Sequence, residues 1–102
     1  MSQPSILLEI DQGVALLTLN RPDNLNSFNE EMHQHMRVVL GQVRKNKNVR
    51  ALVITGSGRA FCAGQDLGDR NVAPGIEAPD LGDSIEKNYN PMLRALHDLP
   101  LP

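Results

Sequence analysis

The feature that most constrains the fold is the order of three segments: residues 14–19 (VALLTL), residues 28–45 and residues 51–56 (ALVITG). The first and third are short and aliphatic, which predicts β-strands. The second has apolar residues at helical spacing, which predicts an α-helix. Two strands separated by a helix favour a parallel pair joined by a right-handed crossover. The predicted fold class is therefore α/β.

Another apolar segment, residues 6–10 (ILLEI), precedes the first of these strands. Only Asp-Gln-Gly at 11–13 separates the two, and a short loop with glycine is typical of an antiparallel hairpin. The segment at 51–56 is apolar throughout rather than alternating, so we expect that strand to be buried. The predicted order is thus a hairpin, then a strand–helix–strand crossover, then a further helix.

The start of the first helix has the sequence SFNE, in which Ser27 stands three residues before Glu30. Serine and glutamate at this spacing form a capping box, so we expect the helix to begin there and to run to about Lys45. Four polar residues are expected mostly off its apolar stripe, namely His33, Gln34, Arg37 and Gln42. The stripe itself consists of Phe28, Met32, Met36, Val39, Leu40 and Val43.

Residues 68–83 are rich in glycine, proline and acidic residues and have no periodic apolar face, so we expect a long surface loop. Helical spacing then returns, with Ser84 as a cap and Pro91 as a kink or restart. The expected apolar residues of this helix are Ile85, Tyr89, Leu93, Leu96 and Leu99. A helix after a buried parallel strand normally leads to another strand, so we expect residues 1–102 to be the incomplete N-terminal portion of a single domain.

Charge and composition exclude several function classes. Ten Lys and Arg against twelve Asp and Glu, with 3% aromatic residues, offer neither the basic surface nor the stacking platform of a nucleic-acid binder. One cysteine cannot form an internal disulfide, and no apolar run approaches the roughly 18 residues of a membrane span. No signal-peptide core is present. We expect a soluble, cytoplasmic protein without nucleic-acid or membrane partners.

The segment GRAFCAGQDLGDR at residues 58–70 raises three chemical alternatives. A phosphate-binding loop needs a Gly-Lys pair that is absent, and Phe61 stands where a dinucleotide fingerprint requires a small residue. Cys62 has no Cys-x-x-Cys partner, so core packing is its more common role. His33 and His35 point to different sides of a helix and are poor metal ligands. No metal site is predicted.

The third alternative is a turn that offers a backbone N–H to a substrate. Ala63 and Gly64 are small and follow a predicted strand, which allows a main-chain amide to point outward instead of closing secondary structure. Oxyanion holes are built in this way. The residues themselves favour this interpretation of the segment over the other two.

Three stretches together resemble the enoyl-CoA hydratase/isomerase (crotonase) family: FCAGQDL (61–67), LTLNRPDNLNSFNEEM (17–32) and LVITGSGRAF (52–61). The resemblance extends over essentially the whole chain and implies the N-terminal part of a crotonase fold. The loop sequences are most similar to an isomerase branch that acts on 1,2-epoxyphenylacetyl-CoA in phenylacetate degradation. The resemblance therefore implies an acyl-CoA thioester substrate, no cofactor beyond the coenzyme A of that substrate, and trimers or hexamers of the full-length protein.

The resemblance also implies site residues. It places an oxyanion-hole donor on the backbone N–H of Gln65, whatever the side chain there. The positions implied to line the coenzyme A groove are Asn24, Leu25, Ala63, Gln65, Asp66 and Leu67. A structural cap is an equally good interpretation of Asp66. Gly68 stands where hydratases of the family often have a lysine facing a coenzyme A phosphate, which leaves Arg21 as a candidate for that contact.

Several functions stay open at this point. The family's second amide donor and its acid/base carboxylates belong to later segments than these 102 residues, so we expect the chain alone to be inactive. Isomerisation of the ring-epoxide thioester is the first hypothesis. An enoyl-CoA hydratase is the second, and a non-catalytic coenzyme A-binding or interaction module, paired through an unfinished sheet edge, is the third.

Overall fold

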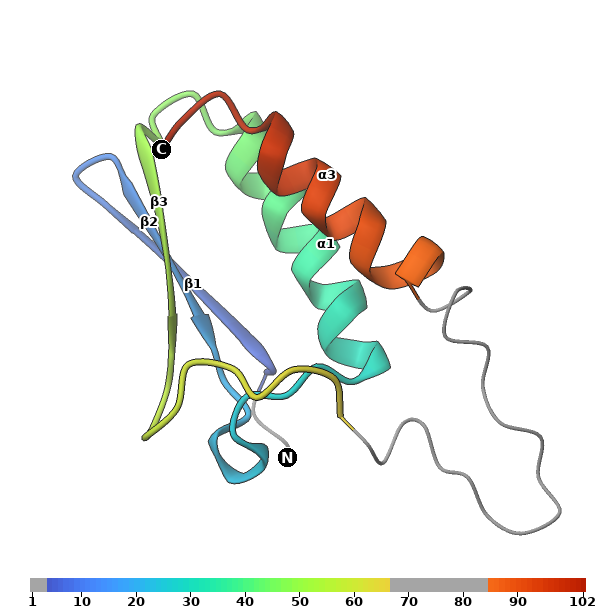
Figure 1. The fold of residues 1–102 in the computed structure, drawn as a ribbon. Coiled ribbons are helices and arrows are strands. Elements are labelled where there is room, and N and C mark those ends of the chain that lie inside the picture. Colours follow the sequence, from blue (N-terminus) through green and yellow to red (C-terminus); the bar gives the residue numbers. More distant parts are fainter. Residues whose placement is uncertain (1–3, 67–84) are drawn as a thin grey trace, which may run out of the picture.

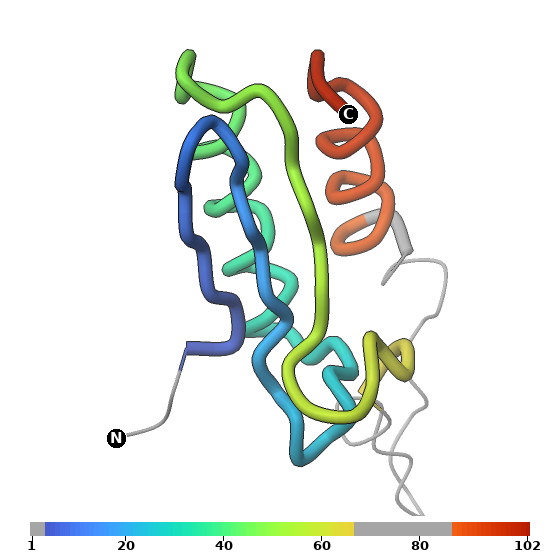
Figure 2. Tube along the Cα trace, turned by 90° about the vertical axis from the view of Figure 1, so that its left-hand side faces the viewer, coloured from blue at the N-terminus to red at the C-terminus, as the bar shows by residue number. Residues whose placement is uncertain are grey.

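The computed structural model describes residues 4–66 and 85–102, so the predicted loop at 68–83 and the predicted cap Ser84 lie outside the described residues. The described part has two layers (Figure 1). A three-stranded sheet in the order β1-β2-β3 forms one layer, and helices α1 and α3 lie against one of its faces. In Figure 2, α1 lies behind the sheet and α3 lies next to α1, past the edge strand β3. The predicted α/β class is confirmed.

Strands β1 (Ile6–Asp11) and β2 (Val14–Leu19) form the predicted antiparallel hairpin. The last residue of β1 pairs with the first residue of β2, so the loop has two residues instead of the expected three. Gln12 and Gly13 have φ of 51° and 83°. Positive φ at both positions is typical of a type I′ turn, whose twist matches that of the strands.

Strand β3 (Ala51–Gly56) pairs in parallel with β2 along its whole length, and the chain between them forms α1. The strand–helix–strand prediction is therefore confirmed. The expected burial of β3 is wrong, because Val53 is 46% exposed and Thr55 is also exposed. The described helices cover one face of the sheet, so alternate β3 side chains face away from the core.

Helix α1 (Glu30–Lys45) ends where predicted but does not begin there. Its N-cap is Asn29, whose side-chain oxygen accepts a hydrogen bond of 2.9 Å from a first-turn N–H. The expected capping by Ser27 is wrong. Phe28 forms a β-bridge with Gln65 instead, and this pairing delays the helix until after residue 29.

The buried face of α1 packs on the inner face of the sheet and forms the core. His33 is a correction to the predicted stripe, because it was expected mostly off that stripe and is 1% exposed. The ring centroids of Phe28 and Tyr89 lie 4.9 and 4.4 Å from that of His33. Aromatic neighbours from outside the helix thus bury a position at the margin of the stripe. The predicted residues Met32, Met36, Val39, Leu40 and Val43 are all buried.

A π-helical turn, η3 (Ile85–Tyr89), leads directly into helix α3 (Asn90–Asp98). Pro91 lies in the first turn of α3, where a missing N–H is tolerated, so the predicted restart at this proline is confirmed. Leu93, expected in the apolar stripe, is 53% exposed, and Met92 is buried in its place. The wider π-turn shifts the helical phase, so regular α-spacing carried forward from residue 85 predicts the wrong face.

Candidate functional site

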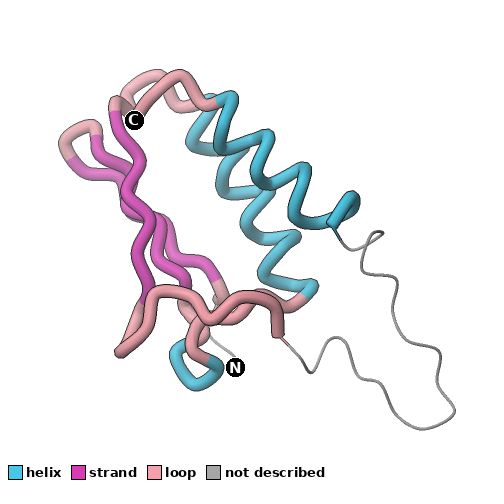
Figure 3. The backbone as a smooth tube through the Cα atoms, viewed as in Figure 1, coloured by secondary structure: helices cyan, strands magenta, loops and turns pink. Residues whose placement is uncertain are grey.

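Two loops meet at the carboxyl ends of the parallel strands β2 and β3. The first, residues 20–28, includes the 3-10 turn η1 (Pro22–Asn24), and the second is residues 57–66. The Ser57 N–H donates to the Leu19 carbonyl at 2.9 Å and joins the two strand ends. Figure 3 shows both loops at the lower end of the sheet. Ligand sites in α/β folds usually lie at this end of the parallel strands.

A short parallel bridge connects the two loops at Phe28 and Gln65. The Phe28 N–H donates to the Gly64 carbonyl at 2.7 Å. The Phe28 carbonyl accepts from the Asp66 N–H at 2.8 Å. These two bonds flank Gln65 on both sides and fix the backbone of the second loop against the first.

The bridge decides where the backbone N–H of Gln65 points. The Gly64 carbonyl and the Gln65 N–H belong to one trans peptide unit and therefore point in opposite directions. Because the carbonyl points at Phe28, the N–H points away from the 20–28 loop. Among the described residues, this N–H has no hydrogen-bond acceptor. The turn depends on Gly64, whose φ of 104° is strained for any residue with a side chain.

The side chain of Gln65 is held by two partners from the helices. The Tyr89 hydroxyl donates to Gln65 Oε1 at 2.5 Å, and His33 Nε2 lies 3.2 Å from the same oxygen. Sequence reasoning treated the side chain at this position as unimportant and missed the cluster. The available signal was a polar His33 at the edge of an otherwise apolar helix face.

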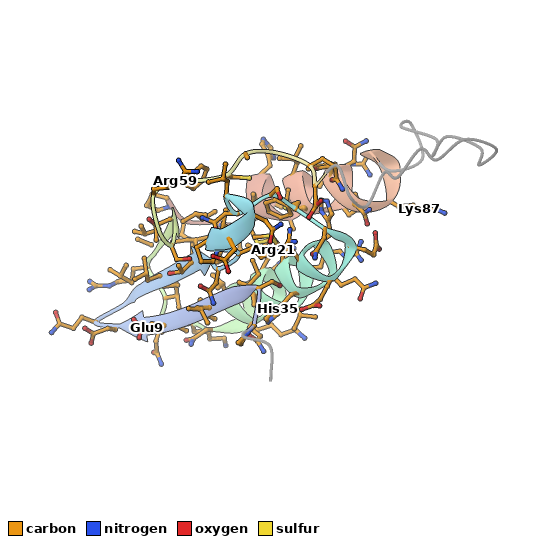
Figure 4. The ribbon with its side chains drawn as sticks, turned by 90° about the horizontal axis from the view of Figure 1, so that it is seen from below. Glu9, Arg21, His35, Arg59 and Lys87 are labelled. Carbon is orange, nitrogen blue, oxygen red and sulfur yellow. The ribbon has the colours of Figure 1, made fainter. Side chains whose placement is uncertain are left out.

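Arg21, which is labelled in Figure 4, links the two loops through its guanidinium group. Its Nη1 donates to the Ser27 carbonyl at 2.5 Å, and its Nη2 pairs with Asp66 Oδ2 at 2.9 Å. The two charged side chains are only 17% and 18% exposed. Arg21 is thus engaged in an internal ion pair, which counts against the suggested phosphate contact and gives Asp66 a structural partner.

Asn26 is a structural residue of the site that sequence reasoning missed. It is fully buried and has φ of 57°, which asparagine tolerates better than most residues. Its Nδ2 donates to the carbonyls of Ser57 and Ala60, each at 2.9 Å. Its Oδ1 accepts from the Arg21 N–H at 2.8 Å. One amide side chain therefore satisfies polar groups of both loops and sets the path of the second loop toward Gln65.

An apolar cavity of about 160 Å³ lies between the sheet, the second loop and the two helices. Cys62 lies at its wall and packs against the core, as expected for a cysteine without a redox partner. Its Sγ accepts a hydrogen bond from the Gly64 N–H at 3.4 Å. The lining side chains are Leu19, Phe28, Met36, Ile54, Phe61, Cys62, Met92 and Leu96.

The structure places the remaining predicted groove residues around the same junction. Asn24 is exposed at the end of η1, and Leu25 follows it half-buried with φ of 53°. The exposed Ala63 donates its N–H to the Leu25 carbonyl at 3.0 Å. Leu67 lies outside the described residues. One surface region therefore combines two segments that are far apart in sequence, with Asn24 and Leu25 from the first loop and Ala63 and Gln65 from the second.

Two searches of residues 4–66 and 85–102 were negative. No three His, Cys, Asp or Glu side chains gather there in a way that could hold a metal ion. No helix in this part of the chain is long and apolar enough to cross a membrane.

A comparison with protein families matches residues 9–102 to the family model described as "Enoyl-CoA hydratase/isomerase". The 1,2-epoxyphenylacetyl-CoA isomerase of Escherichia coli is 56% identical over 97 residues, which is 95% of this chain and 37% of that protein. A Rhodobacter capsulatus protein named "Probable enoyl-CoA hydratase" is 42% identical over 102 residues, or 100% of this chain and 37% of that protein. The chain thus spans well under half the length of these relatives.

A comparison with solved structures also finds proteins with a similar backbone that are named as enoyl-CoA hydratases. An enoyl-CoA hydratase from Mycobacterium smegmatis superposes with a TM-score of 0.83 at 32% sequence identity. The superposition covers 98% of this chain and 38% of that one.

Proposed function

The chain belongs to the enoyl-CoA hydratase/isomerase family, and we propose that its Gln65 N–H is an oxyanion-hole donor to the thioester carbonyl of an acyl-CoA substrate. The observation that carries the proposal is the direction of this N–H. The Phe28–Gly64 hydrogen bond turns it away from the first loop, and among the described residues it has no acceptor. A fixed donor of this kind costs no reorganisation when charge develops on a substrate oxygen.

The thioester explains what such a donor does. Moving a proton, a water molecule or a ring bond next to a thioester carbonyl builds enolate-like charge on its oxygen. A preorganised N–H aimed at that oxygen lowers the barrier by about 3 kcal/mol. The family resemblance implies a second N–H and the acid/base carboxylates in segments other than these 102 residues. We therefore expect the 102-residue chain alone to bind thioesters without turning them over.

The proposed reaction is the isomerisation of 1,2-epoxyphenylacetyl-CoA, as part of phenylacetate catabolism. It is supported by 56% identity to the Escherichia coli protein of that name, against 42% to the Rhodobacter capsulatus protein named as a hydratase. No cofactor is proposed beyond the coenzyme A of the substrate. Assembly of the full-length protein into trimers or hexamers and a cytoplasmic location stay predictions.

The proposed coenzyme A groove runs along the junction of the two loops. Asn24 and Leu25 form one side, and Ala63 and Gln65 form the other. Leu67, which lies outside the described residues, stays a predicted groove residue. The ion pair between Arg21 and Asp66 favours a structural role for Asp66, which holds this groove together rather than contacting the ligand. The polar phosphates of coenzyme A then need cations other than Arg21.

The proposal is tested with protein expressed from the complete reading frame that encodes these residues. We expect turnover of 1,2-epoxyphenylacetyl-CoA to exceed hydration of crotonyl-CoA. Gln65→Pro removes the N–H and should lower kcat by about 10²–10³, whereas Gln65→Met keeps the N–H and should retain much more activity. Circular dichroism controls for folding. A folded Gln65→Pro variant with wild-type kcat would refute the donor, and faster hydration would favour the hydratase hypothesis.

A further inference from the structure

The Gln65 side chain is the meeting point of three separate segments. Gln65 lies in the loop after β3, His33 lies in the first turn of α1 and Tyr89 ends η3. The Tyr89 hydroxyl is 2.5 Å and His33 Nε2 is 3.2 Å from Gln65 Oε1. The amide oxygen can only accept, so the second contact is a hydrogen bond in the histidine tautomer that carries its proton on Nε2.

The two partners are themselves tightly placed. The His33 and Tyr89 rings stand nearly perpendicular, at 84°, with centroids 4.4 Å apart. Phe28 completes the cluster at 4.9 Å from the His33 ring. Because His33 is 1% exposed, water does not compete for its side of the cluster, and hydrogen bonds there are stronger than at the surface.

Two further hydrogen bonds hold η3 against α1 and so fix the position of Tyr89. Arg37 Nη1 donates to the Lys87 carbonyl at 2.8 Å. Asn88 Nδ2 donates to Glu30 Oε2 at 3.0 Å. The phenol oxygen is therefore carried on a turn that is bonded to the first helix at Lys87 and at Asn88, the two residues before Tyr89.

The backbone at residue 65 needs such an anchor. Its peptide unit begins at Gly64, a residue at φ of 104° where an added Cβ would meet no atom within 4 Å. The Phe28 N–H fixes the carbonyl of the unit. The Phe28 carbonyl accepts from the Asp66 N–H and holds the other side of residue 65. The two bonds to the Gln65 side chain add a further restraint on the tilt of the Gly64–Gln65 peptide unit, because glycine itself permits a wide range of backbone angles.

We propose that Tyr89 and His33 are positioning residues, which aim the Gln65 N–H by holding the Gln65 side chain. This inference rests on the proposed function of that N–H as the oxyanion donor. The Gln65 side chain then contributes to catalysis by orienting the residue, although the group that contacts the substrate is the backbone N–H. Misplacement of a catalytic group by about 1 Å can cost on the order of 10²-fold in rate, so loss of one of two anchors is expected to cost about tenfold.

The test compares four variants of the protein from its complete reading frame. Tyr89→Phe removes the hydroxyl and keeps the ring, Gln65→Met keeps the size and N–H of residue 65 and removes its acceptor, and a double variant combines them. Leu93→Ala is the control, because it shortens a side chain of the following helix α3 that is 53% exposed and lies outside the cluster around Gln65. We expect kcat to fall about tenfold in the first two variants with KM within about twofold, no further loss in the double variant, and wild-type kcat in the control.

A second readout is the ¹H–¹⁵N resonance of the residue 65 amide. We expect it to shift on binding of phenylacetyl-CoA and not with the thioether analogue that lacks the carbonyl oxygen, and this difference should shrink in Tyr89→Phe and in Gln65→Met. Equal shifts and equal kcat in wild type and Tyr89→Phe would overturn the positioning role and leave the proposed donor intact. No difference between the two ligands in the wild type would overturn both.

Discussion

Replacing Gly64 by alanine tests the backbone geometry on which the proposed site depends. An added Cβ would meet no atom within 4 Å, so the substitution is free of steric overlap with neighbours. Its cost comes from φ of 104°, a sparsely populated region that costs side-chain-bearing residues about 1–3 kcal/mol. Reduced entropy of the unfolded chain returns about 0.4–1 kcal/mol. We expect the free energy of unfolding to fall by about 0.5–2 kcal/mol.

Gly41 provides the matched control for this substitution. It lies inside α1, and a Cβ there also meets nothing within 4 Å. Alanine is favoured over glycine in a helix interior, so Gly41→Ala should raise the free energy of unfolding by about 0.5–1 kcal/mol. Urea unfolding followed by circular dichroism measures both variants. A Gly64→Ala protein as stable as Gly41→Ala would refute the claim that the turn requires a positive φ.

Three further experiments test the loops and the helix start by urea unfolding. In a double-mutant cycle, Arg21→Met and Asp66→Asn should show a coupling energy of about 0.5–3 kcal/mol, because the two side chains share a half-buried ion pair. Additive effects of the two substitutions would exclude a stabilising ion pair. Asn26→Asp should cost about 2–4 kcal/mol, since it removes two buried donors and faces two carbonyls with a carboxylate; unchanged stability would contradict this. Asn29→Ala removes the N-cap and should lower the free energy of unfolding by about 0.5–2 kcal/mol. A larger loss of helix content in Ser27→Ala would instead support the capping box at Ser27.

The sequence by itself determined the elements and their order. Two apolar runs around a short glycine-containing loop predicted the hairpin, and a further apolar run predicted the third strand. Spacing of about 3.6 residues predicted the body and the end of α1. Pro91 predicted a restart that α3 shows. These features follow from local backbone preferences and from which side chains avoid water, and both are written in neighbouring residues. The crotonase motif likewise pointed to Gln65 as the residue to examine.

Only the tertiary structure decided which groups pair across the chain. Helix α1 begins after Asn29 because Phe28 bonds to a loop met more than thirty residues later. His33 is buried because rings from outside its helix cover it, and Val53 is exposed because the described helices lie on one face of the sheet. Hydrogen bonds and ring contacts of this kind depend on distances between remote segments, which periodicity does not encode. The direction of the Gln65 N–H is of the same kind, since it is set by the remote donor that its neighbouring carbonyl accepts.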